Sequence, residues 1–147
     1  MMDTIKKILL IDDNPEEQHL FKEAVSRVSK EVECYYADSV VNAFLLLESM
    51  KGGLPDIIFL DINMPLHNGR DGLKALKLSK RFSHIPVVMY TIQDLTHQKA
   101  ELREIGASFS LQKPELRELV LILRFLLGER QTTADLEDVE KLFLKFA

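Results

Sequence analysis

Five polar side chains stand at the points where short apolar runs of the sequence end: Asp12, Asp13, Asp61, Thr91 and Lys113. Three are carboxylates, one is a hydroxyl and one is an ammonium group. A carboxylate can act as a nucleophile, while a lysine and a hydroxyl can hold the oxygens of an anionic group. If the fold brings these side chains together, they suit the transfer of an anionic group onto a carboxylate.

The three aspartates also predict a metal site. Three carboxylates in one small space repel one another strongly unless a cation joins them. Asp12, Asp13 and Asp61 would offer oxygen ligands only, and an oxygen cluster with room for water suits Mg²⁺. Lys113 would add a second, fixed positive charge. We therefore predict a Mg²⁺ site at these aspartates.

The apolar runs before these side chains are typical of strands that alternate with helices. The run 57–60 is bounded by Pro55 and by Asn63-Met64-Pro65, which favours a strand buried on both faces. The expected strands cover residues 8–11, 32–37, 57–60, 85–91 and 107–112. The expected helices begin after Asn14, Ser39, Gly69 and Asp94 and at Glu115, and they end near Lys30, Gly52, Phe82, Gly106 and Leu127.

This alternation predicts an α/β fold. Strands that alternate with helices imply right-handed crossovers and a parallel sheet with helices on both faces. We predict a doubly wound, five-stranded parallel sheet. Ligands of such sheets bind outside the carboxyl ends of the strands, so this fold would gather the five polar side chains at one edge.

Length and composition are those of an ordinary globular protein. A chain of 147 residues favours one domain, and its net charge of −4 argues against nucleic acid or a membrane surface as a partner. The single cysteine, Cys34, excludes an intrachain disulfide and a cysteine-based zinc site. The sequence shows no signal-peptide pattern and no apolar run of about 18 residues, so we expect a cytoplasmic protein.

The strand-end motifs resemble the receiver domain of bacterial two-component response regulators. The matching segments occur in the family's order: Ile11-Asp12-Asp13, Leu60-Asp61-Ile62-Asn63-Met64-Pro65 with Asn68-Gly69, residues 85–91, Gly106-Ala107 and Lys113-Pro114. The resemblance covers residues 5 to about 127. It implies a flavodoxin-like sheet with strand order 2-1-3-4-5. It also implies a magnesium-dependent phosphoprotein that works in phosphorelay signal transduction.

The resemblance also implies roles for the acidic residues. Asp61 would accept a phosphoryl group from a phosphohistidine on a sensor histidine kinase or a phosphotransfer protein. Asp13 would bind Mg²⁺ directly, and Asp12 would bind it directly or through water. Asp61 and the backbone carbonyl of Asn63 would complete the metal ligands.

Thr91 and Lys113 would, by the same resemblance, bind phosphoryl oxygens and relay the change to the following helix and strand. Two positions depart from the family pattern. The family usually has an aromatic residue three positions before the lysine, where this chain has Ser110, and we expect either a lost coupling or a shift that lets Phe109 replace it. The residue after the threonine is often small in the family, and here it is Ile92.

The expected function is that of a stand-alone response regulator that signals by protein–protein contact and is not an enzyme. By resemblance, receivers of this build often serve phytochrome-type or hybrid kinases. One alternative is a vestigial receiver that acts as a phosphorylation-independent interaction module. Another is a phosphatase of the haloacid dehalogenase type, which also uses a strand-end aspartate and Mg²⁺. Its nucleophile, however, follows the first strand and has an aspartate two residues later, where this chain has Asn63.

We expect residues 1–127 to form the receiver domain and residues 128–147 to form a C-terminal helical extension rather than a separate domain. The extension carries an apolar stripe: Leu136, Val139, Leu142, Phe143 and Phe146. In the preceding helix, Leu121, Ile122 and Phe125 have no obvious cover. The two apolar surfaces are expected to meet, either within one chain or across a homodimer.

Overall fold

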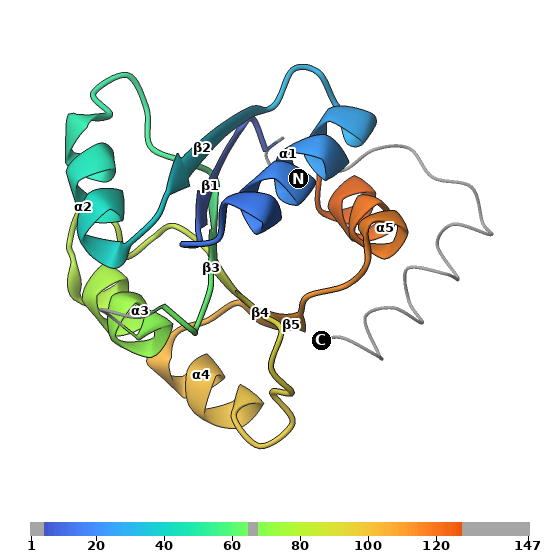
Figure 1. Cartoon of the computed structure of the whole chain (residues 1–147). Helices are drawn as coiled ribbons and strands as arrows, with labels where there is room; N and C mark the ends of the chain where they lie inside the picture. The colour runs from blue at the N-terminus through green and yellow to red at the C-terminus, as the bar shows by residue number, and fades with distance from the viewer. Residues whose placement is uncertain (1–4, 65–67, 128–147) are drawn as a thin grey trace.

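The protein is described here from a computed structural model, which covers residues 5–64 and 68–127. Within these ranges, strands and helices alternate from the first element to the last (Figure 1). In chain order they are β1 (Lys7–Ile11), α1 (Pro15–Val28), β2 (Glu33–Ala37), α2 (Val40–Ser49), β3 (Ile57–Leu60), α3 (Gly69–Leu78), β4 (Val87–Thr91), α4 (Lys99–Ile105), β5 (Phe109–Gln112) and α5 (Leu116–Leu126).

The strands form one parallel sheet with the order β2-β1-β3-β4-β5, which confirms the predicted fold class. The register of the sheet pairs Ile11 of β1 with Leu60 of β3, and Leu60 with Met89 of β4. The residues that follow these strands therefore emerge side by side at the carboxyl edge of the sheet.

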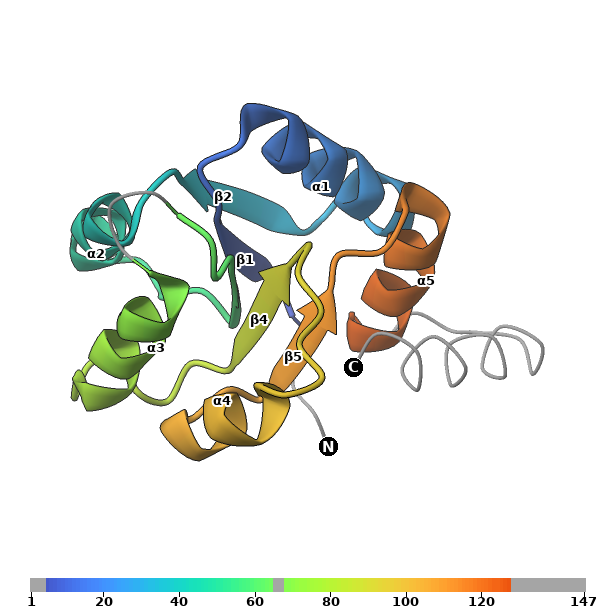
Figure 2. The same ribbon diagram turned by 60° about the horizontal axis from the view of Figure 1, so that its bottom comes forward.

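Helices cover both faces of the sheet, as Figure 2 shows. Helices α1 and α5 lie together on one face, and α2, α3 and α4 lie on the other. Successive strand residues point to opposite faces, so Ile58 and Leu60 join the core under α2–α4 while Ile57 and Phe59 join the core under α1 and α5. Burial on both faces explains why β3 is entirely apolar.

Side-chain caps begin the helices next to the carboxyl edge of the sheet. The Asn14 side chain accepts a hydrogen bond from the N–H of Glu16 (2.9 Å), and that of Ser39 accepts one from the N–H of Asn42 (3.0 Å). Each cap satisfies a backbone donor that the helix leaves without a partner. The two caps set the direction in which the chain leaves β1 and β2.

Two expected helix boundaries were wrong by four residues, and the others differ from the structure by at most three. Helix α3 ends at Leu78 rather than near Phe82, because the N–H of Ser79 closes the last turn and the chain then forms a separate turn. Helix α4 begins at Lys99. Asp94 caps a turn ahead of that helix by accepting the N–H of Thr96 (2.9 Å).

The expectation that Ile122 lacks cover was also wrong. Ile122 is fully buried, because α5 packs beside α1 and turns this side chain into the shared core. On the same helix, Phe125 is 45% exposed. The predicted extension over residues 128–147 lies outside the described residues. Among the helices that the structure describes, none is long and apolar enough to cross a membrane.

Candidate functional site

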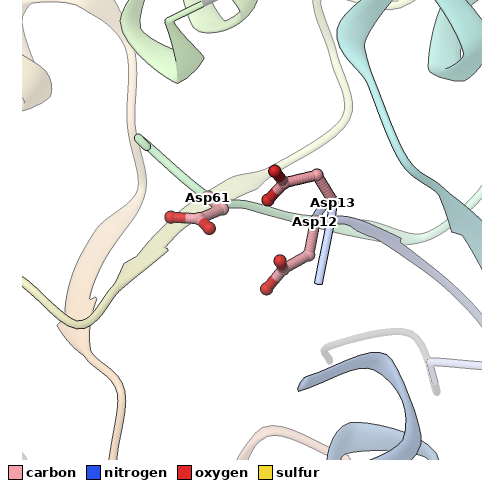
Figure 3. Close-up of side chains that lie close together, drawn as sticks. All are labelled: Asp12, Asp13 and Asp61. Carbon is pink, nitrogen blue, oxygen red and sulfur yellow. The ribbon is translucent and has the colours of Figure 1, made fainter. Parts of the chain in front are cut away.

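Three aspartates meet at the carboxyl edge of the sheet (Figure 3). Asp12 and Asp13 follow β1, and Asp61 follows the neighbouring strand β3. One carboxylate oxygen from each residue lies within 4.8 Å of the others. The pairing of β1 with β3 places these residues together, so the juxtaposition predicted from the sequence is present in the fold.

Lys113 joins the carboxylates from the far side of β4. Its Nζ donates a hydrogen bond to Asp12 Oδ2 (2.7 Å) and lies 3.5 Å from Asp61 Oδ2. The side chain of Lys113 is 7% exposed and that of Asp12 is 1% exposed, so this ion pair is shielded from water. The backbone N–H of Lys113 donates to the carbonyl of Thr91 (2.7 Å). This hydrogen bond extends the pairing of β4 with β5 and fixes the backbone position from which the lysine side chain starts.

Burial and charge shift the ionisation of this cluster in opposite ways. Burial raises the pKa of the Asp61 carboxyl, and the nearby charge of Lys113 and a hydrogen bond from the N–H of Asn63 only partly oppose that shift. Burial disfavours the charged form of Lys113, but the hydrogen bond and charge of Asp12 prevail and raise the lysine pKa. Lys113 therefore stays protonated and positively charged, while burial makes the anionic form of the neighbouring Asp61 less favourable.

Thr91 and Asn63 lie at the same edge of the sheet. Thr91 is fully buried at the end of β4, and its hydroxyl accepts a hydrogen bond from the N–H of Gln93 (3.3 Å). The N–H of Asn63 donates to Asp61 Oδ1 (3.1 Å). The binding of a phosphoryl oxygen by Thr91 and of a metal by the Asn63 carbonyl both stay predictions.

The position three residues before the lysine is occupied by Ser110, which is 8% exposed. Strand β5 pairs with β4 in a regular register, with Met89 opposite Ser110 and Val88 opposite Phe109. Phe109 is 40% exposed. Strand β5 is therefore not shifted, and Phe109 does not take the place of Ser110.

Three residues near the cluster were missed by the sequence analysis. Glu17 Oε2 lies 3.9 Å from Lys113 Nζ, and the Gln18 side chain donates to the carbonyl of Asp12 (2.6 Å). Lys113 Nζ also lies over the ring of Tyr90, 5.3 Å from its centre. Glu17 lies in the first turn of α1, directly after the strand end that carries Asp12 and Asp13, and this position brings it to the same edge of the sheet.

The residues present fit a hard divalent cation. All three clustered groups are carboxylates, and oxygen ligands are those that Mg²⁺ and similar ions prefer. The raised pKa of Asp61 reflects a burial cost for its anionic form, which a bound cation would offset. The donor set therefore suits the predicted metal without fixing its identity.

Comparison with known proteins identifies the family. The model of the response regulator receiver domain matches residues 8–124, and the chain belongs to this family. Receiver domains interact with histidine kinases or phosphotransfer proteins. The predicted resemblance is thus confirmed.

Individual relatives agree with this assignment. Response regulator Rre1 of Synechocystis is 30% identical over 87% of this chain, and the chain spans about half of that relative (54%). The crystal structure of the Mn²⁺-bound response regulator Rcp1 has a TM-score of 0.74 at 23% identity and covers 86% of this chain and 97% of its own. The phosphorylated cyanobacterial phytochrome response regulator RcpA has a TM-score of 0.73 at 24% identity and covers 83% of this chain and 91% of its own. These two solved structures share the fold.

Proposed function

We propose that this chain is a phosphorylatable response regulator whose phosphoryl acceptor is Asp61. The proposal depends above all on the position of the Asp61 carboxylate, which lies at the end of β3, 3.5 Å from the Lys113 ammonium and beside two further carboxylates. A buried nucleophile next to a fixed cation and a predicted metal site suits phosphoryl transfer, where positioning and charge stabilisation do most of the work.

The donor in the proposed reaction is a phosphohistidine. An oxygen of the Asp61 carboxylate attacks phosphorus, and the phosphorus–nitrogen bond to the imidazole breaks. The electron pair of that bond stays on the imidazole nitrogen, which takes up a proton from solvent. The product is an acyl phosphate on Asp61.

Other residues of the chain would hold the transferred group. The Lys113 ammonium, which donates to Asp12, would also donate a hydrogen bond to one phosphoryl oxygen. The Thr91 hydroxyl would donate to another. Mg²⁺ held by the three aspartates and the Asn63 carbonyl would neutralise charge on the phosphoryl oxygens. This assignment is supported by the donor set described above.

The proposed donor is a sensor histidine kinase or a phosphotransfer protein, and the output is contact with another protein. A phytochrome-type kinase is included because RcpA, which shares the fold, is described as a phytochrome response regulator. We propose that residues 1–127 suffice for the phosphoryl chemistry and that the protein works in the cytoplasm.

Intact-mass measurement after incubation with Mg²⁺ and acetyl phosphate tests the proposal. One added phosphate on the wild type and none on Asp61→Asn is the expected result. Asp56→Asn is a matched control, because Asp56 is exposed at the opposite end of the sheet, where it accepts the N–H groups of Lys6 and Lys7.

An unmodified wild type would be tested again with a phosphorylated histidine kinase. Transfer from the kinase alone would indicate a donor-selective receiver. No transfer from either donor would overturn the proposal and favour an interaction module that works without phosphate, an alternative to which the buried Ser110 already points.

A further inference from the structure

The Lys113 ammonium has an aromatic partner in addition to its carboxylates. Its Nζ lies over the Tyr90 ring, 5.3 Å from the ring centre. A cation within about 6 Å of a ring centre is attracted to the electron-rich ring face. The Lys113 side chain is only 7% exposed, and this attraction is strongest where water is excluded.

Two further aromatic rings hold Tyr90 in place. The ring of Phe21 on α1 meets it edge to face with centres 6.0 Å apart, and the ring of Phe59 on β3 does so at 5.8 Å. Tyr90 itself is 1% exposed. Because all three rings are closely packed, the Tyr90 ring is a fixed support rather than a side chain that can swing away.

The ring differs from the other partners of Lys113 in carrying no charge. Burial, and then the nearby carboxylates, raise the pKa of the Tyr90 phenol, so the ring stays neutral at physiological pH. The charge on Asp61 changes when it is phosphorylated, and the electrostatic attraction between this residue and Lys113 changes with it. The contact with Tyr90 does not depend on that charge.

We propose that Tyr90 is a positioning residue for phosphoryl transfer, whose ring keeps the Lys113 ammonium within reach of a phosphoryl group on Asp61. This inference rests on the proposed function. Without the ring, the position of the ammonium would be set by the carboxylates alone, and its shortest contact is with Asp12 (2.7 Å) rather than Asp61 (3.5 Å). Phosphorylation would then be slower.

The test is the rate of labelling by acetyl phosphate in Mg²⁺, followed by intact mass, in four proteins. We expect Tyr90→Phe, which keeps the ring, to match the wild type. Tyr90→Leu should be slower by about 3- to 30-fold, the range of rates that corresponds to a cation–π contact. Phe82→Leu is the matched control, since Phe82 is equally buried but lies in the core on the opposite face of the sheet. It should label like the wild type.

Proton NMR measures the contact between Lys113 and the Tyr90 ring directly, and a role of Tyr90 in stability alone would not produce this signal. Side-chain protons of Lys113 over the ring should be shifted upfield in the wild type and in Tyr90→Phe, and the shift should be lost in Tyr90→Leu. Because the wild type itself carries this signal, the geometry is tested even if Tyr90→Leu does not fold. An unshifted Lys113 in the wild type would overturn the inference.

The outcomes separate this inference from the function on which it rests. A wild type that labels while Tyr90→Leu labels as fast as Phe82→Leu would overturn the role of Tyr90 and leave the proposed function standing. If neither acetyl phosphate nor a phosphorylated kinase phosphorylates the wild type, both the role of Tyr90 and the proposed function are overturned. Slow labelling confined to Tyr90→Leu, with the upfield shift present, would establish Tyr90 as the positioning residue.

Discussion

At the scale of single residues, Asp61 combines a functional position with a cost to stability. Burial raises the pKa of its carboxyl above the ordinary value of 3.8. The folded state therefore binds the proton more tightly than the unfolded state, and stability falls as pH rises from the unfolded pKa through the folded one. Above the folded pKa the full cost is present.

We therefore predict that metal-free Asp61→Asn melts at a higher temperature than the metal-free wild type at pH 7. The difference should shrink as pH falls toward 3.8, where the wild-type carboxyl becomes neutral. Thermal unfolding in a chelator, repeated across pH, measures it. Added Mg²⁺ should stabilise the wild type more than the variant, because a ligand of the folded state shifts the unfolding equilibrium. A less stable variant at pH 7 would contradict the prediction.

Ile92 supports a second residue-scale prediction. It directly follows Thr91 and is 69% exposed, so it can screen the edge of the site while adding little to the core. We expect Ile92→Ala to shorten the lifetime of the phosphoryl group several-fold by admitting water, and to change the free energy of unfolding by less than about 0.5 kcal/mol. Phosphoryl loss followed by mass measures the lifetime, and equal lifetimes would end the idea.

At the scale of elements, the start of α3 is built against the strand end that carries Asp61. The N–H of Gly69 donates to the carbonyl of Ile62 (2.8 Å), and a Cβ on Gly69 would overlap the carbonyl oxygen of Asp61 and lie 2.7 Å from Ile62 Cα. No side chain can enter that space unless the backbone after β3 moves.

Gly69→Ala should therefore destabilise the fold by about 1–3 kcal/mol, the usual cost of overpacking, and also slow the phosphorylation of Asp61. Chemical denaturation and the acetyl phosphate assay measure the two effects. Gly52→Ala is the control, because a Cβ there has no atom within 4 Å, and it should be close to neutral. If Gly69→Ala behaved like that control, the close packing of α3 on the strand end would be wrong.

At the scale of the whole molecule, residues 5–127 contain a complete sheet with a core on each face, within the part of the chain that the structure describes. We predict that a chain ending at Gly128 unfolds cooperatively, because the described elements already form a buried core on each face of the sheet. Since Phe125 on α5 is 45% exposed, we also expect the removed segment to contribute to stability by packing on α5 of its own chain.

Light scattering and thermal unfolding of the full and shortened chains test this prediction. The expected result is a monomer in both cases, with a lower melting temperature for the shortened chain. A full chain of twice the monomer mass that becomes monomeric on shortening would instead support a homodimer through α5 and the C-terminal segment. A shortened chain that does not fold would contradict the predicted domain boundary.

Much of this protein follows from local sequence. Apolar runs and their breakers predicted the three central strands, β1, β3 and β4, because a strand buried on both faces is apolar along nearly its whole length. Asn14 and Ser39 predicted where helices begin, since a cap acts on the residues next to it. The β-α alternation then implied a parallel sheet, and the parallel sheet implied that Asp12 and Asp61 would meet.

Only the tertiary structure decided which groups surround the predicted site. Lys113 was expected beside the aspartates, but only the fold decides that its shortest contact is with Asp12, 101 positions away, rather than with Asp61. It also lies over Tyr90, which sequence reasoning had not connected with it. The burial of Ile122 likewise depends on α1, far away in the sequence. Such contacts depend on strand order and register summed over the whole sheet, so no local pattern encodes them, whereas strands and caps are encoded by neighbouring residues.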